Sequence, residues 1–154
     1  MIIGLISDTH GLLRPEALGA LAGVDALLHA GDVGAPDVLT RLRTIAPLHV
    51  VHGNNDPADA WPHTVRATFE QVDILMIHEL AHLEVAMLAS PPQLIVFGHS
   101  HKPALYEQAG IHYLNPGAAG PRRFSLPISV ARLHVHGADW RVEFINLLDE
   151  RPLP

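Results

Sequence analysis

Five short apolar runs, each followed at once by polar residues, constrain the fold of this chain more than any other feature of its sequence. They are rich in Ile, Val and Leu, and they mostly lack the alternation of apolar and polar residues found in strands with one wet face. This pattern predicts strands that are buried on both faces. The runs lie at residues 2–6, 24–30, 47–51, 73–77 and 93–97.

Helix-compatible segments separate the first three runs. Residues 14–22 and 36–45 each carry a proline near the start, where a helix tolerates it. The order strand, helix, strand, helix, strand predicts an α/β core. From about residue 104 the pattern changes, and turn residues separate four segments that predict antiparallel strands. These segments are ALYEQ, IHYLNP, ISVARLHVHG and WRVEFINLL.

The composition limits the class of protein. With 154 residues, 48% hydrophobic and 17% charged, the chain predicts a single globular domain spanning residues 1–154. No apolar stretch approaches 18 residues, and the N-terminal run is too short for a signal peptide, so we expect no membrane contact and a cytoplasmic location. The net charge of −6 and the lack of a Lys or Arg run argue against stable nucleic-acid binding. A homo-oligomer is compatible with the sequence.

Residues able to bind a metal ion follow every one of the five runs. Because ligands bind at the carboxyl ends of strands in open α/β sheets, these side chains predict one polar site. The chain has no cysteine, and Asp, Asn and His suit Mn, Fe, Zn or Ni in an open site more than a structural zinc. Seven candidate ligands exceed the need of one ion, whereas two ions sharing a carboxylate would use them. They are Asp8, His10, Asp32, Asn54, His78, His99 and His101.

The motifs DTHG, GD, GNND, a strand-final His and GHSH, in this order, resemble those of the calcineurin-like metallophosphoesterases. The NPG at 115–117 further resembles their small single-domain prokaryotic phosphodiesterase branch, and the likeness spans residues 2 to about 120. It implies an α/β (α+β) fold, a four-layer αββα sandwich of two mixed sheets flanked by helices. It also implies a phosphodiesterase that cleaves a small phosphodiester with a hydroxide held between two divalent ions. Manganese is the expected metal, with Ni, Fe, Co and Zn as alternatives.

The resemblance also implies a role for each ligand. By that likeness the first ion is held by Asp8, His10, Asp32 and His101. The second is held by Asp32, which bridges, together with Asn54, His78 and His99.

Two positions depart from the family pattern. Many members have a His after the metal-binding Asn, as the acid for the leaving group, whereas this chain has Asn55, which cannot give a proton to an alkoxide. Asp56 or water is the alternative acid, so Asn54, Asn55 and Asp56 are the candidate catalytic residues. Asn55, Arg122 and Arg123 are the candidate substrate contacts, with a solvated surface pair as the alternative for the two arginines.

The second departure is Glu79, where the family usually has Gly. It creates His78-Glu79-Leu80-Ala81-His82, which on a helix would be the HExxH motif of a zinc metalloprotease. This remote alternative leaves the other four strand-end motifs unexplained, and the extended form of the motif is absent. A further alternative is a non-catalytic protein-binding scaffold on the same fold, like some eukaryotic trafficking relatives that have lost ligands. The presence of every candidate ligand argues against it.

Overall fold

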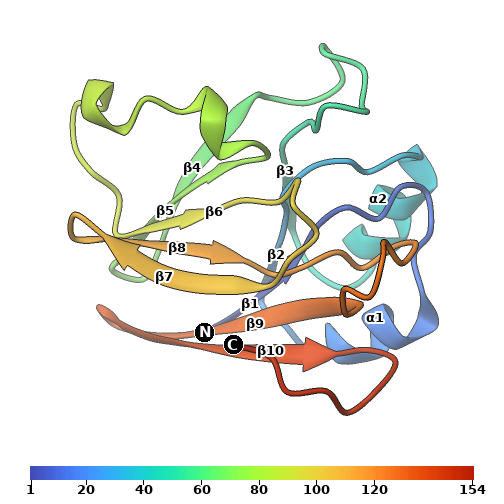
Figure 1. The fold of residues 1–154 in the computed structure, drawn as a ribbon. Coiled ribbons are helices and arrows are strands. Elements are labelled where there is room, and N and C mark those ends of the chain that lie inside the picture. Colours follow the sequence, from blue (N-terminus) through green and yellow to red (C-terminus); the bar gives the residue numbers. More distant parts are fainter.

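The computed structural model, which describes residues 1–154, consists of two five-stranded mixed sheets packed face to face (Figure 1). The first sheet has the order β10-β9-β1-β2-β3. Its strands are β1 (Ile2–Ile6), β2 (Ala26–His29), β3 (Leu48–Val50), β9 (Ser129–His136) and β10 (Asp139–Asn146). The second sheet has the order β4-β5-β6-β8-β7. Its strands are β4 (Thr64–Phe69), β5 (Val72–Ile77), β6 (Leu94–Val96), β7 (Ala104–Gln108) and β8 (Ile111–Asn115).

The five apolar runs form parallel strands in the two sheets. β1 pairs in parallel with β2, and β2 with β3, while β5 pairs in parallel with β6. The crossovers of the first sheet contain α1 (Pro15–Ala20) and α2 (Pro36–Arg43), each beginning at its proline. The four later segments form antiparallel hairpins, β7 with β8 and β9 with β10. The sequence-based strand and helix predictions are confirmed for these elements.

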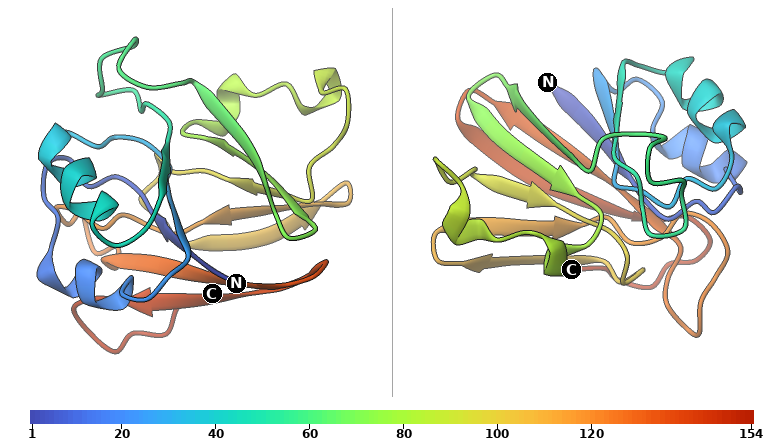
Figure 2. Two further views of the ribbon diagram at one scale, coloured as in Figure 1. Left: turned by 180° about the vertical axis from the view of Figure 1, so that it is seen from behind. Right: turned by 90° about the horizontal axis from the view of Figure 1, so that it is seen from above.

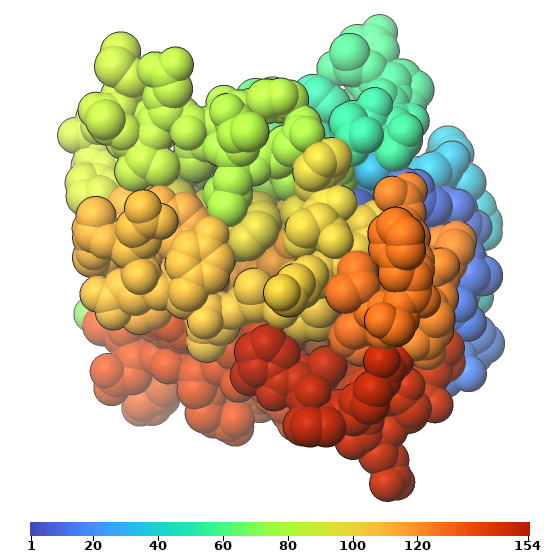
Figure 3. Space-filling model, viewed as in Figure 1, coloured from blue at the N-terminus to red at the C-terminus, as the bar shows by residue number.

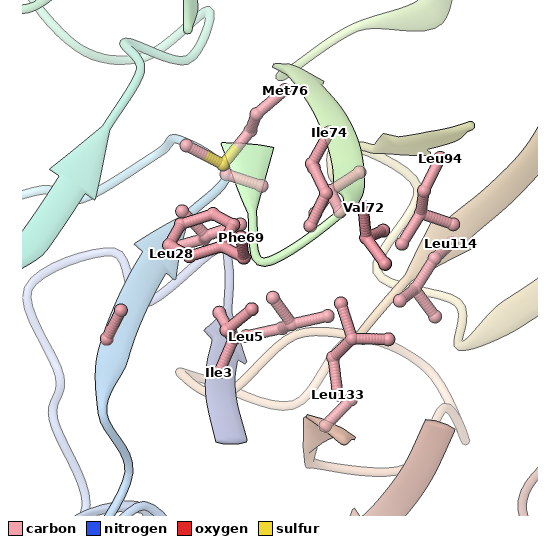
Figure 4. Close-up of a cluster of buried hydrophobic side chains, with 14 of the residues drawn as sticks. Ile3, Leu5, Leu28, Phe69, Val72, Ile74, Met76, Leu94, Leu114 and Leu133 are labelled. Carbon is pink, nitrogen blue, oxygen red and sulfur yellow. The ribbon is translucent and has the colours of Figure 1, made fainter. Parts of the chain in front are cut away.

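A buried apolar layer fills the space between the two sheets (Figure 4). Leu5 and Leu28 reach it from the first sheet, and Ile74, Leu94 and Leu114 from the second. Burying one such side chain completely contributes about 1.5–3 kcal/mol, so this layer fixes how the sheets lie against each other. It thereby also fixes the loops that leave their strand ends.

The outer faces of the sheets are covered differently. Helices α1 and α2 cover the first sheet, with Ala17, Leu39 and Leu42 buried against it (Figure 2). Over the second sheet lie only two 3₁₀ turns, η1 (Leu80–His82) and η2 (Val85–Met87), and the segment around them. The predicted two-sheet sandwich is confirmed, with short 3₁₀ turns in place of α-helices in its fourth layer. None of the helices combines the length and the apolar character that crossing a bilayer requires.

Strand β4 was not predicted from the sequence. It pairs antiparallel with β5 at the edge of the second sheet, and its exposed residues Thr64, Arg66 and Thr68 alternate with partly buried ones. Arg66 also forms an ion pair with Asp73 at 2.6 Å. An edge strand with one solvent-exposed face has no continuous apolar run, and such runs were the signal that predicted the parallel strands.

Candidate metal centre

Five of the seven candidate ligands have a left-handed backbone. The φ angles are 52° for Asp8, 46° for His10, 56° for Asp32, 73° for His99 and 62° for His101. Each such conformation costs an L-residue on the order of 1 kcal/mol, and it persists only where the surrounding structure enforces it. Strain of this kind gathers at functional sites. The loops after β1, β2 and β6 therefore use unfavourable backbone angles to aim these side chains.

The carboxylate of Asp8 lies fully buried among imidazoles, and its Oδ1 atom has no hydrogen-bond partner. Three histidine Nε2 atoms surround Oδ1, those of His101 at 3.4 Å, His10 at 3.8 Å and His78 at 3.9 Å. A buried carboxylate oxygen without a hydrogen bond is costly, and a bound cation would satisfy it.

Asp8, His10 and His101 form the first group with metal-ligand geometry. The Nε2 atoms of His10 and His101 lie 3.3 Å apart. Ligand atoms placed about 2.1 Å from one ion lie roughly 3.0–3.4 Å from each other in octahedral or tetrahedral arrangements. Two of the three distances within this group, 3.3 and 3.4 Å, are of that size, and the third, from Asp8 Oδ1 to His10 Nε2, is 3.8 Å. A small inward shift of the His10 ring would let all three donor atoms bind a single divalent cation.

A second group, Asp8, Asp32 and His78, shares Asp8 with the first. The Oδ1 atom of Asn54 is 3.0 Å from His78 Nε2 and 3.1 Å from His99 Nδ1. The Nδ1–H of His78 donates to the backbone oxygen of Ala30 at 2.7 Å, which leaves Nε2 as the ring nitrogen that faces the group. The amide oxygen of Asn54 and the two imidazole nitrogens beside it are atom types that bind a divalent cation.

Asp32 lies between the two groups. Its Oδ2 atom is 3.6 Å from His10 Nε2 and 3.5 Å from His78 Nε2. Burial opposes ionisation of this carboxyl, but the contact with His78 and the backbone N–H of Asn55 outweigh it and hold the pKa of Asp32 below its ordinary value. Burial lowers the pKa of His10, which keeps its ring neutral at pH 7. A deprotonated carboxylate and a neutral imidazole are the forms that bind metal ions.

The model of the calcineurin-like phosphoesterase superfamily domain matches residues 1–138 of the chain. The chain belongs to this superfamily. Among curated proteins, a probable metallophosphoesterase of Methanothermobacter thermautotrophicus is 34% identical over 160 residues, covering 95% of this chain and 92% of that protein. The recognition made from the five strand-end motifs is thus confirmed.

Solved structures share the phosphoesterase fold. A structure described as a novel archaeal phosphodiesterase superposes with a TM-score of 0.76 at 20% identity, covering 94% of this chain and 100% of that one. Vps29 of Entamoeba histolytica, crystallised in complex with Zn²⁺, superposes with a TM-score of 0.72 at 21% identity, covering 96% and 99%. These likenesses establish the metallophosphoesterase fold for the chain.

Two candidate catalytic residues of this phosphoesterase are engaged in supporting the centre. Asn55 donates from its backbone N–H to Asp32 Oδ1 at 2.9 Å and from its side-chain amide to Oδ2 at 3.0 Å. Asp56 accepts backbone N–H groups of Val33, Gly34 and Gly53 at 2.8–3.1 Å. Asp56 therefore ties the loop after β2 to the loop after β3, and both of its oxygens already have partners.

The two candidate substrate arginines differ in their surroundings. Arg122 donates to the backbone oxygen of Leu126 at 3.1 Å and lies 3.7 Å from the carboxylate of Asp149, so its contacts are within its own loop and with the C-terminal segment. Arg123 is exposed, and burial together with the charge of this guanidinium lowers the pKa of His10. Of the two, Arg123 is the cation whose charge acts on a candidate ligand.

The HExxH motif does not form a protease site. His78 directly follows β5 and lies 3.5 Å from Asp32, whereas only the three residues Leu80–His82 form a 3₁₀ turn. His82 instead places its Nδ1 atom 3.2 Å from Glu79. The zinc metalloprotease alternative is wrong because the motif needs one α-helix to bring both histidines to a single ion.

A cleft of about 140 Å³ opens beside the second group. Besides Asn54 and His78 it is lined by Glu79 and by three histidines outside the ligand set, His52, His63 and His82. No sequence pattern indicated that His52 and His63 line it, because they flank β3 and β4 and meet only in the folded chain. In the space-filling view, segments near residues 60 and 85 project from the upper edge of the molecule (Figure 3).

His29, at the end of β2, forms hydrogen bonds with the loops after β1 and β2 and makes the stability of the protein depend on pH. Its Nδ1 atom accepts the backbone N–H of Gly31 at 3.1 Å, and its Nε2–H donates to Thr9 Oγ1 at 3.0 Å. The first of these bonds requires a neutral ring, because a protonated Nδ1 cannot accept. Burial lowers the pKa of His29 to about 4.

Because the unfolded chain takes up this proton near pH 6.5, stability is full above that pH and declines as the pH falls towards 4. The free energy of unfolding should drop by about 2 kcal/mol between pH 7 and pH 5 through His29 alone. Urea unfolding of the chelated protein at both pH values measures this drop. The His29→Gln variant cannot titrate and should lose it, so equal pH slopes in the two proteins would contradict the prediction.

Proposed function

We propose that this metallophosphoesterase is a phosphodiesterase that works with two divalent metal ions. The observation that carries the proposal is the pair of adjoining ligand groups, with Asp32 Oδ2 within 3.6 Å of an imidazole nitrogen from each. One group alone would suffice for one ion. The donor set of carboxylate, amide and imidazole suits manganese first, with Ni, Fe, Co and Zn as alternatives.

Each candidate ligand has a place in this proposal. Asp8, His10, Asp32 and His101 would hold the first ion, and Asp32, Asn54, His78 and His99 the second. When bound, the two ions supply an acidified water as the nucleophile and the positive charge that neutralises the phosphate oxygens.

The protein's own residues favour diesters with good leaving groups. Asn55 has no transferable proton, and the oxygens of Asp56 are committed to backbone N–H groups. An alkoxide leaving group needs a general acid, which contributes about 10²–10⁴-fold, whereas an aryl oxide leaves without one. The exposed Arg123 offers a guanidinium to a phosphate oxygen of the substrate. These features support a small phosphodiester as the substrate.

Turnover of bis(p-nitrophenyl) phosphate tests the proposal. The chelated protein, reconstituted separately with Mn²⁺, Ni²⁺, Co²⁺ or Zn²⁺, is expected to hydrolyse this diester best with Mn²⁺. An alkyl phosphomonoester should react at least about 100-fold more slowly, because no residue protonates its leaving group. A complete lack of turnover with all four metals would instead favour the non-catalytic scaffold.

A further inference from the structure

Glu79 occupies a position between two histidines at the mouth of the centre. It follows His78 directly, and its carboxylate is about three-quarters buried. Its Oε1 atom lies 3.0 Å from His99 Nε2, and its Oε2 atom lies 3.2 Å from His82 Nδ1. Both oxygens therefore have an imidazole partner.

His99 needs such a partner more than the other candidate ligands do. Its side chain is 44% exposed, and its φ of 73° is the largest positive value among the non-glycine residues. Its other side-chain contacts are Asn54 Oδ1 at 3.1 Å from Nδ1 and an edge-on packing against the His78 ring. An imidazole that is half exposed on a strained loop would otherwise rotate among several orientations.

The contact with Glu79 selects one tautomer of His99. A carboxylate only accepts hydrogen bonds, so the proton of the neutral ring must sit on Nε2. The Nδ1 atom then presents its lone pair to Asn54 and the second group. In metal sites a carboxylate behind a histidine fixes the ring and raises its basicity, and its loss typically weakens metal binding 10–100-fold.

His82 holds the carboxylate in place. The 3₁₀ turn Leu80–His82 brings the His82 ring back over Glu79. In this turn the backbone N–H of His82 donates to the backbone carbonyl oxygen of Glu79 at 3.0 Å. The carboxylate is thus fixed from one side by His82 and acts on His99 from the other. In this chain the H-E-x-x-H sequence thus places Glu79 between His82 and His99, whereas in a protease its two histidines bind one zinc ion.

We propose that Glu79 is a positioning residue that orients His99 as a ligand of the second metal ion. This inference rests on the two-ion part of the proposed function. It predicts an unequal effect, in which loss of Glu79 weakens the second ion and leaves the first unchanged, because no ligand of the first group contacts this carboxylate.

Calorimetric titration of the chelated protein with Mn²⁺ tests the inference through affinity. The Glu79→Gly variant should bind one of the two Mn²⁺ ions about 10–100-fold less tightly, with the other Kd within twofold of wild type. Glu79→Gln keeps a carbonyl acceptor for His99 and should recover most of the loss. Glu84→Gln removes a carboxylate from the exposed side of the same segment and should change neither Kd.

Nitrogen-15 NMR of the metal-free protein tests the contact independently of any ion. His99 should be in the Nε2–H form in wild type and in Glu84→Gln, and should become a mixture of tautomers in Glu79→Gly. If Glu79→Gly keeps both Kd values and the wild-type tautomer, or weakens both ions equally, the inference is overturned while the proposed function stands. If the wild-type protein binds no Mn²⁺, the proposed function fails and this inference fails with it.

Discussion

The Asp32→Ala variant is expected to lose phosphoesterase activity by on the order of 10³-fold or more, since a single donor to a developing oxyanion is already worth 10²–10³. Asp32 Oδ2 faces an imidazole of each ligand group, His10 at 3.6 Å and His78 at 3.5 Å. Its removal takes a negative charge from both groups at once. The metal content after dialysis should therefore fall for both ions, unlike the one-sided effect expected at Glu79.

A matched control separates the role of Asp32 from a general change of charge. Asp59 is exposed in the loop that borders the cleft, and Asp59→Asn removes one carboxylate without touching either group. This variant should keep wild-type turnover and metal content. Turnover of bis(p-nitrophenyl) phosphate and metal analysis of both variants are the measurements. An Asp32→Ala protein that is folded and retains full activity would refute the two-ion model.

The candidate ligands could be predicted from the sequence because each follows a strand that is recognisable from its apolar residues. A continuous apolar run marks a strand buried on both faces, and its end marks where the next polar side chain emerges. Asp8 after β1 and His78 after β5 are such cases, although they belong to different sheets. The buried layer between the sheets brings those strand ends together, and the family resemblance supplied that arrangement in advance.

The supporting residues could not be predicted in the same way. Whether Asp56 would act as an acid or brace two loops depends on where the backbone N–H groups of Val33 and Gly34 point, and no sequence pattern encodes that. The contact of Glu79 with His99 joins positions on different loops. Local sequence pointed only to a helix-borne motif at Glu79, which the end of β5 rules out.

The centre is also where several residues adopt backbone conformations that are unfavourable for L-amino acids. Asp8, Asp32 and His99 all hold left-handed angles, although a glycine at any of them would relieve the strain. Such strain is kept where function requires a particular side chain in a particular direction. The hydrogen bonds around the centre serve this end, because Asn55 holds the Asp32 carboxylate and Ser7 Oγ holds Asp8 Oδ2 at 2.7 Å.

The close packing behind Asp32 leads to the second large effect. Gly53 lies against Asp32, and a Cβ atom at position 53 would overlap both the Oδ1 atom and the backbone nitrogen of Asp32. Gly53→Ala must therefore displace the carboxylate that faces both ligand groups. Overpacking of this kind typically costs about 1–3 kcal/mol of stability. We expect the melting temperature to fall by about 2–4 °C for each kcal/mol, together with loss of Mn²⁺ binding at both positions.

Gly19→Ala makes the same chemical change as Gly53→Ala, but we expect it to raise the stability of the protein and not to lower it. A Cβ atom at this exposed position of α1 would meet nothing within 4 Å. Because alanine is the better helix former, this variant should be about 0.5–1 kcal/mol more stable with unchanged turnover. Thermal unfolding of the chelated proteins and Mn²⁺ titration compare the pair. If Gly53→Ala matched wild type in both measurements, the tight contact between Gly53 and Asp32 could not be what positions that carboxylate.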